Sequence, residues 1–350
     1  MRFRDLISLV RAPAALSVPG DVVAGAGAAG ALSPSTAGLA GASVCLYWAG
    51  MAANDWADRE LDAVERPERP IPSGRISPRA AFGIAAGLTG AGLALAGAAG
   101  GRRALAVAGP LAAAVWAYDL KLKNTAAGPA GMAVCRGLDV MLGASGSARM
   151  ARAVPSALAV ALHTYTVTAL SRREVSGAEP RLAAVTLATT AALTGAVATT
   201  GHLWKTASER RAHALHSGPP SDGAGEGAGR RSAQPTPHRG GRWDGLGGGR
   251  VEGAFGRGGD ERADKRRRAW RLAATAVMAA GYAVKYGRAQ AAVIGDPAAP
   301  RVRAAVGAGI TSLPSLQGAL AARSGAPFVG MAVAAAAPLA GALARKVSPT

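Results

Sequence analysis

The sequence predicts an all-α membrane protein, a polytopic bundle of nine or ten transmembrane helices around a central cavity. Of the 350 residues, 49% are hydrophobic and only 17% are charged. The apolar residues form long blocks rich in Ala and Gly, and several blocks are nearly free of charge. Small residues also let helices approach closely, as packing inside a membrane requires. A soluble Ala/Gly-rich helical protein is the disfavoured alternative, because the blocks are longer than ordinary buried helices need.

Ten apolar stretches are expected to form these helices. Several are shorter than the roughly 20 residues that cross a bilayer, and the stretch near the C-terminus contains Pro314 and Gln317, so nine helices is the alternative count. In chain order the stretches are Ala12–Leu32, Ala37–Ala53, Ala80–Gly100, Ala104–Ala117, Gly128–Gly146, Val154–Leu170, Leu182–Trp204, Trp270–Ile294, Val302–Ala322 and Pro327–Ala344.

Residues 205–268 interrupt the apolar pattern. They are rich in Gly, Ser, Pro and Arg and end near the run Lys265-Arg266-Arg267-Arg268. Such a composition buries too little apolar surface to fold, which predicts a disordered basic insertion. The insertion divides a membrane bundle at residues 1–204 from C-terminal transmembrane helices at residues 269–350, which are expected to complete the bundle.

The formal net charge of +19 is spread over loops, so no nucleic-acid partner is expected. The positive-inside rule places the more basic set of short loops in the cytoplasm. This orientation predicts an integral protein of the cell membrane with its chemically active loops facing the cytoplasm. The loops assigned to that side carry Arg2, Arg4, Arg11, Arg59, Arg66, Arg69, Arg75, Arg79, Lys121, Lys123, Arg172, Arg173 and Arg181.

An acidic motif follows the second apolar stretch. Asn54, Asp55, Asp58 and Asp62 recur at i, i+1, i+4 and i+8, so a continuous helix would carry them along one narrow face. The negatively charged carboxylates on such a face repel one another unless cations lie between them. Hard oxygen ligands suit Mg²⁺ better than a soft transition metal, and a diphosphate bridged by that metal is the expected partner.

Four ionisable residues lie inside predicted spans and are candidates for substrate binding: Asp21, Arg136, Asp139 and His163. Arg136 and Asp139 are three residues apart on one predicted helix, so a purely structural ion pair is the alternative. His163 and Tyr165 are placed to face an acceptor substrate, although a hydrogen bond between helices would also explain them.

Two segments together resemble the UbiA superfamily of intramembrane prenyltransferases. The run from Asn54 to Asp62, followed by Glu65-Arg66-Pro67-Glu68-Arg69-Pro70-Ile71-Pro72-Ser73-Gly74-Arg75-Ile76-Ser77, is similar to the first aspartate-rich motif of that superfamily and its trailing loop. The run Tyr118-Asp119-Leu120-Lys121-Leu122-Lys123-Asn124-Thr125 resembles its lysine-bearing loop. The resemblance covers roughly residues 5–204, and within the superfamily the chain looks most like the EboC-type branch.

The resemblance implies an Mg²⁺-dependent enzyme that transfers a prenyl group from a prenyl diphosphate to a small-molecule acceptor, aromatic or other, within the lipid membrane. By position it assigns Asn54, Asp55 and Asp58 to the metal, with Asp62 as a further ligand or a support. The implied catalytic set is Asp55, Asp58, Asp62, Lys121 and Lys123. Which of the two lysines faces the diphosphate stays open, and Arg69 is a further phosphate contact unless its charge serves topology alone.

The chain departs from the superfamily where a second D-x-x-x-D motif is expected. Residues 165–179 contain no aspartate. Glu174 is the carboxylate placed to replace it as a metal ligand. Arg172 and Arg173 offer a second solution, because a guanidinium binds phosphate directly and bidentately.

Two other classes of function remain as alternatives. One is a catalytically weakened carrier or accessory protein that binds an isoprenoid. The other is a cation-coupled transporter, which is disfavoured because transporter sites lie near the bilayer midplane, whereas this acidic motif lies at a helix end beside a Pro/Arg-rich loop.

Overall fold

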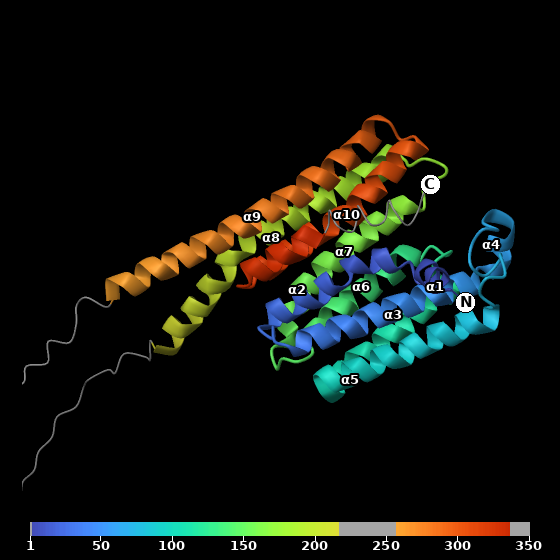
Figure 1. The fold of residues 1–350 in the computed structure, drawn as a ribbon. Helices are drawn as coiled ribbons and strands as arrows, with labels where there is room; N and C mark the ends of the chain where they lie inside the picture. The colour runs from blue at the N-terminus through green and yellow to red at the C-terminus, as the bar shows by residue number, and fades with distance from the viewer. Residues whose placement is uncertain (1, 217–256, 337–350) are drawn as a thin grey trace, which may run out of the picture. The chain divides into compact units, whose positions relative to one another are not determined.

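The structure, a computed structural model, describes residues 2–216 and 257–336, and within them it contains helices, turns and loops but no strand. The all-α class is therefore confirmed (Figure 1). The elements in chain order are α1 (Phe3–Leu9), η1 (Ala12–Ser17), α2 (Pro19–Ala29), α3 (Ser35–Ala57), α4 (Arg59–Glu65), α5 (Pro78–Ala117), η2 (Tyr118–Leu122), α6 (Gly128–Ala144), η3 (Met150–Ala153), α7 (Val154–Ser171), α8 (Pro180–His216), α9 (Arg257–Gly295) and α10 (Ala299–Arg323).

The expected count of nine or ten helices is not confirmed. The described residues form the helices α1 to α10 and a further apolar helix, Pro327–Ala336. The count differs partly because α1 and α4 have only seven residues each, too few to cross a bilayer. Four stretches of the described chain are long and apolar enough to span a membrane: Ser35–Ala57, Pro78–Leu122, Met150–Ser171 and Pro180–Thr199. The protein is accordingly an integral membrane protein.

α5 is a helical hairpin rather than one rod. Gly101 has φ 63° and ψ −154°, a conformation that is essentially restricted to glycine. Phe82 and Trp116, one from each side of this kink, have ring centroids only 5.9 Å apart. Because 34 residues of continuous helix would separate them by roughly 50 Å, the two arms run antiparallel. The predicted stretches Ala80–Gly100 and Ala104–Ala117 correspond to these arms.

The first predicted span is divided into the 3₁₀ helix η1 and the short helix α2. α2 packs against α6 through two glycines. A Cβ on Gly25 would lie 1.8 Å from the carbonyl oxygen of Val140, and one on Gly143 would lie 2.0 Å from that of Val22. Only glycine permits so close a backbone approach at these two positions, and the approach brings Asp21 of α2 against the polar side chains of α6.

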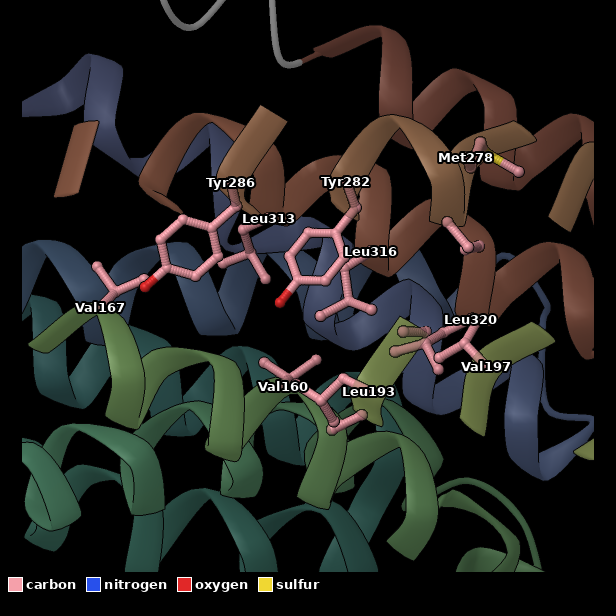
Figure 2. Close-up of a cluster of buried hydrophobic side chains, with 14 of the residues drawn as sticks. Val160, Val167, Leu193, Val197, Met278, Tyr282, Tyr286, Leu313, Leu316 and Leu320 are labelled. Atoms are coloured by element: carbon pink, nitrogen blue, oxygen red, sulfur yellow. The ribbon is translucent and has the colours of Figure 1, made fainter. Parts of the chain in front are cut away.

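Helices α7, α8, α9 and α10 share an apolar core, which Figure 2 shows in close-up. Val160 of α7, Leu193 of α8 and Leu316 of α10 all belong to it. Tyr282 and Tyr286 of α9 are fully buried in the same core. Their hydroxyl groups need partners there, and α7 provides them: His163 Nδ1 lies 3.0 Å from Tyr282 Oη, and Thr166 Oγ1 lies 3.2 Å from Tyr286 Oη.

The chain divides into two compact units. One comprises Met1–Gly201 with Arg268–Thr350, and the other comprises His202–Arg267. The insertion expected at residues 205–268 begins inside α8 and ends inside α9, because residues 205–216 and 257–268 are helical. Good helix formers such as Lys, Glu, Arg and Ala make up much of both edges. The central part of the expected insertion, residues 217–256, lies outside the described residues.

Candidate active site

The acidic motif lies where α3 ends and α4 begins. Asn54 and Asp55 occupy the last turn of α3, Asp58 caps it with φ −87° and ψ 5°, and Asp62 belongs to α4. The expectation of one uninterrupted helical face was therefore wrong beyond Asp58. Backbone hydrogen bonds from Asp58 N to Asn54 O (3.0 Å) and from Asp62 N to Asp58 O (2.8 Å) nevertheless keep the side chains close together.

Two arginines neutralise the buried aspartates of the motif. Asp55 and Asp62 are 3% and 2% exposed. Arg69 Nη1 lies 3.3 Å from Asp55 Oδ1 and 2.5 Å from Asp62 Oδ2, so one guanidinium bridges both carboxylates. Arg11 Nη2 adds a second contact to Asp55 Oδ1 at 2.8 Å. The predicted phosphate ligand Arg69 is thus held inside the acidic cluster.

The loop that carries Arg69 is fixed by its own contacts. Ile71 and Ile76 are buried against the ends of α1, α3 and α5. Ser73 Oγ donates to the carbonyl of Arg69 at 2.6 Å, and Arg75 Nη1 donates to Asp5 Oδ1 at 3.2 Å. The apolar and polar anchors explain how a Pro-rich loop can present one arginine to two aspartates.

Of the two candidate lysines, Lys123 is the one that reaches the motif. Its Nζ lies 2.7 Å from Asp58 Oδ1, whereas Lys121 is exposed. The difference follows from the π-helical turn η2, in which Lys123 N donates to Tyr118 O at 3.0 Å. Arg172 Nη1 donates to the carbonyl oxygens of Lys123 and Thr125. Arg172 therefore supports the lysine loop.

Asp119 joins the site although it was not among the residues expected there. It is 2% exposed, and its Oδ1 accepts a hydrogen bond from Asn54 Nδ2 at 3.2 Å. A signal was present in the sequence, because Asp119 is an ionisable residue next to the lysine loop at the end of an apolar stretch. Arg11 was likewise counted only as loop charge, and its pairing with Asp55 depends on a contact 44 residues away in the sequence.

A pocket of about 60 Å³ adjoins the acidic motif between α3, α5 and α6. Apolar side chains such as Leu46, Met51 and Leu111 form most of its wall. Asp119 lies at one end, near Gly50, and Ser43 lines it seven residues earlier on α3, about 10 Å away along the helix axis. The pocket thus has polar groups at separated positions and apolar walls between them.

The polar group around Ser43 belongs to a buried network between α2, α3, α6 and α10. Arg136 Nε lies 2.8 Å from Asp21 Oδ2, and Gln317 Nε2 donates to Asp21 Oδ1 at 2.6 Å. Asp139 instead accepts hydrogen bonds from Ser43 Oγ, at 2.6 Å and 2.7 Å to its two oxygens. The ion-pair partner of Arg136 is therefore Asp21, not the expected Asp139, because α2 approaches α6 closely enough to provide it.

Three other predicted site residues lie away from the acidic motif by their described contacts. Glu174 offers its backbone carbonyl to Arg303 Nη1 of α10 at 3.1 Å. Burial raises the pKa of its carboxyl group, although the Arg303 guanidinium lowers it. Arg173 is exposed, and Tyr165 is 45% exposed on α7. None of the three has a described contact with Asp55, Asp58 or Asp62.

The donor chemistry of the motif suits a hard cation. Asn54, Asp58 and Asp119 present carboxylate and amide oxygens, the ligands that Mg²⁺ prefers. Within residues 2–216 and 257–336, however, no three His, Cys, Asp or Glu side chains converge into a preformed ligand set. Arg69, Arg11 and Lys123 already neutralise Asp55, Asp62 and Asp58.

Similar solved structures share this fold. A UbiA homologue from Aeropyrum pernix K1 superposes with a TM-score of 0.53 at 18% identity, over 87% of this chain and 96% of that one. A second structure, reported in a study of digeranylgeranylglyceryl phosphate synthase in membranes, gives a TM-score of 0.56 at 14% identity, over 93% of this chain and 98% of that one. At these identities the likeness concerns the fold alone.

Curated relatives match shorter parts of the sequence. The digeranylgeranylglyceryl phosphate synthase of Ignicoccus hospitalis is 33% identical over 187 residues, covering 51% of this chain and 59% of that relative. The synthase of the same name from Methanopyrus kandleri is 40% identical over 110 residues, covering 31% of this chain and 38% of the relative. The chain thus spans less than two thirds of the length of these relatives. The EboC-type placement stays a prediction, because the relatives named here carry other names.

The sequence model of the UbiA prenyltransferase family matches residues 16–208. That match covers more than half of the 350 residues and includes both the acidic motif and the lysine loop. The chain belongs to the UbiA prenyltransferase family.

Proposed function

We propose that this protein is an Mg²⁺-dependent prenyltransferase that transfers a prenyl group from a prenyl diphosphate to a small-molecule acceptor inside the membrane. The observation that carries the proposal is the gathering of Asp58, Lys123 and Arg69 in the acidic motif. The motif is connected to an apolar pocket through Asn54, which contacts the pocket residue Asp119. Cations at the motif favour a diphosphate, and apolar pocket walls favour an isoprenoid. The family supports the same chemistry.

In the proposed reaction the bond between the allylic carbon and the diphosphate oxygen breaks. A new bond forms from that carbon to the acceptor, and the acceptor releases a proton. Lys123 and Arg69 offset the negative charge that develops on the diphosphate. The apolar pocket wall excludes water, which would otherwise capture the allylic cation. A bound Mg²⁺ would supply further neutralisation of the leaving group, held by oxygens of Asn54, Asp55, Asp58 and Asp62.

We assign the acceptor to the part of the pocket around Ser43. Ser43, Arg136 and Asp139 line the pocket there. Arg136 Nε is paired with Asp21 Oδ2 at 2.8 Å. Buried polar groups are costly unless they are paired, so an acceptor with hydrogen-bonding groups suits this end better than a hydrocarbon tail. The acceptor itself is unidentified.

We also propose that the protein lies in the cytoplasmic membrane with the acidic motif on the cytoplasmic side, because the loops on that side carry more positive charge.

The proposal is tested by binding and by turnover. Purified protein in detergent is titrated with geranylgeranyl diphosphate, the donor suggested by the names of the relatives, with and without Mg²⁺. We expect Mg²⁺-dependent binding that weakens at least about tenfold in Asp58→Asn, because the substitution removes a carboxylate from a shared metal site. Glu65→Gln, an exposed carboxylate of α4, is the matched control and should bind normally.

Turnover is tested by mass spectrometry of lipids and prenylated small molecules from cells that express either the natural protein or Asp55→Asn. A new prenylated species that depends on Asp55 supports an enzyme. Equal diphosphate affinity in Asp58→Asn and Glu65→Gln would rule out the acidic motif as the donor site.

A further inference from the structure

Lys285 and Arg288 lie one helical turn apart on the face of α9 that points away from its apolar core. Both side chains are exposed, whereas Tyr282 and Tyr286 of the same helix are fully buried. Lys285 Nζ donates a hydrogen bond to the backbone carbonyl of Thr311 in α10 at 3.2 Å. In the part of the chain that the structure describes, no carboxylate forms an ion pair with either cation. The proposed reaction uses neither residue.

The neighbours of α9 indicate that these two cations lie at membrane depth. α9 shares its apolar core with α7 and α8, and both of those helices contain stretches long and apolar enough to span a membrane. A Cβ on Gly287, between the two cations, would lie 3.4 Å from Leu187 Cδ1. Leu187 is seven residues after the start of α8, about 10 Å along the helix axis. Lys285 and Arg288 therefore lie roughly 9–13 Å inside the end of the α8 span.

α10 gives a similar depth through a different neighbour. A Cβ on Gly309 would lie 2.6 Å from Val167 Cγ2, and Val167 is four residues before the end of α7. Thr311, the acceptor for the lysine, is two residues further along α10, which places it about 9 Å inside the same end. The loops at this end meet directly, since Ala178 N donates to Pro297 O at 3.0 Å. Both measures thus start from the same edge of the bundle.

A cation at this depth is costly unless an anion accompanies it. From Trp270 to Arg323 the sequence contains a single acidic residue, Asp296, and that residue pairs with Arg301 at 3.3 Å. The anion must therefore come from outside this helix pair. Val284 and Ile310, on the same two helices, are 49% and 55% exposed. A molecule that combines an anionic group with apolar chains complements both the charge and the apolar surface.

We infer that Lys285 and Arg288 bind the phosphate of an anionic phospholipid, in the leaflet that borders the loop after α7. The planar guanidinium of Arg288 can contact two phosphate oxygens. Lys285 adds a second positive charge, while its aliphatic stem lies along the apolar face of α9. The acyl chains lie against Val284 and Ile310. This lipid site is separate from the acidic motif and does not depend on prenyl transfer.

The test compares two lipids on the full-length protein in detergent. The protein is incubated with equal amounts of dioleoyl phosphatidylglycerol and dioleoyl phosphatidylcholine, and native mass spectrometry measures the lipid that stays bound. We expect the natural protein to retain phosphatidylglycerol preferentially. The double variant Lys285→Gln/Arg288→Gln should weaken this retention by about tenfold or more, because two cations facing the phosphate are lost. Arg102→Gln/Arg103→Gln, two exposed arginines of α5, removes the same charge and should retain the lipid normally.

Inorganic phosphate, compared with chloride at equal ionic strength, is the second probe. It has no acyl chains, so it should displace little phosphatidylglycerol. Displacement of most of the lipid by phosphate, or equal retention of the two lipids by the natural protein, would overturn the inference.

Thermal unfolding without added lipid checks that each variant is folded. If the double variant is misfolded, Arg288→Gln decides alone, because the described Arg288 side chain has no hydrogen bond or ion pair to lose. That single variant should weaken retention by about fivefold. Unchanged retention of phosphatidylglycerol in a folded Arg288→Gln protein, or an equal loss in Arg102→Gln/Arg103→Gln, would reject the site.

Discussion

Lys123 Nζ lies 2.7 Å from Asp58 Oδ1, with the two side chains 12% and 23% exposed. This ion pair connects the turn after α5 to the junction of α3 and α4, two segments 65 residues apart. A pair so little exposed is screened less than a surface salt bridge. It holds a cation and a carboxylate in place at the acidic motif before any substrate arrives.

The first prediction concerns the bridge made by Arg69. Among the described residues, Arg69→Ala leaves Asp62 without a paired cation and Asp55 with Arg11 alone, and both carboxylates are almost fully buried. We expect a loss of about 3 kcal/mol in the free energy of unfolding, because an uncompensated buried charge is costly. The measurement is the thermal unfolding midpoint in detergent. Arg66→Ala, an exposed arginine of the same loop, is the control, and an equal loss there would contradict the bridging role.

The second prediction concerns the core between α7 and α9. Tyr282→Phe removes the hydroxyl that lies 3.0 Å from His163 Nδ1. The imidazole is 1% exposed, and its Nδ1 atom is left without the described partner. We expect a destabilisation of about 1–3 kcal/mol. Tyr165→Phe deletes a hydroxyl from a half-exposed ring and should change stability much less. Equal unfolding midpoints for the two variants would show that the buried hydrogen bond contributes nothing.

The third prediction concerns the contact between α2 and α6. Gly25→Ala places a Cβ 1.8 Å from the carbonyl oxygen of Val140, which forces the helices apart. We expect at least about 1–3 kcal/mol of destabilisation, as in other overpacked cores. Gly109→Ala in α5 meets no atom within 4 Å and should be neutral or stabilising, since alanine favours helix. A folded Gly25→Ala protein as stable as Gly109→Ala would be incompatible with this packing.

The fourth prediction is a pH dependence at Glu174. Burial raises the pKa of this carboxyl group in the folded protein, with Arg303 acting in the opposite direction. The unfolded chain therefore loses the proton at a lower pH than the folded protein does. Stability that is present below the unfolded pKa is lost as the pH rises through the folded pKa. Glu174→Gln has no carboxyl group at this position, so its stability should not show this decrease with pH.

Thermal unfolding midpoints of both proteins, measured from about pH 4 to pH 8 around the ordinary glutamate pKa, check the prediction. The midpoint of the natural protein should fall relative to that of Glu174→Gln as the pH rises, and the difference should then level off. Glu179→Gln, an exposed carboxylate of the same loop, is the control. A difference that stays constant, or that grows in the opposite direction, would refute the assignment.

The sequence was sufficient for those features that depend on local pattern. Long apolar blocks predicted an all-helical membrane protein, because a backbone in lipid must satisfy its own hydrogen bonds. The runs Asn54–Asp62 and Tyr118–Thr125 predicted the family, which the match over residues 16–208 confirmed. Helix periodicity also predicted that Asn54, Asp55 and Asp58 belong together, and they do, up to the break at Asp58.

Periodicity specifies which residues share a helix face, but not which other element that face contacts. Lys121 and Lys123 are equivalent in the sequence, and only the π-helical turn η2 distinguishes the inward lysine from the exposed one. Arg136 has a carboxylate three residues away on its own helix, yet its partner is Asp21, 115 positions earlier in the sequence. A local rule favoured Asp139, and the close packing of α2 on α6 overrode it.

The sequence by itself thus determined the membrane class, the acidic motif and the family. The class depends on composition, and the motif and the family depend on contiguous runs of residues. The tertiary structure decided the cations that neutralise the motif, the inward lysine and the place of Asp119 beside Asn54. These features depend on contacts between helices far apart in the chain. The physical reason is that a buried charge is stable only beside a partner, and the identity of that partner is fixed by packing.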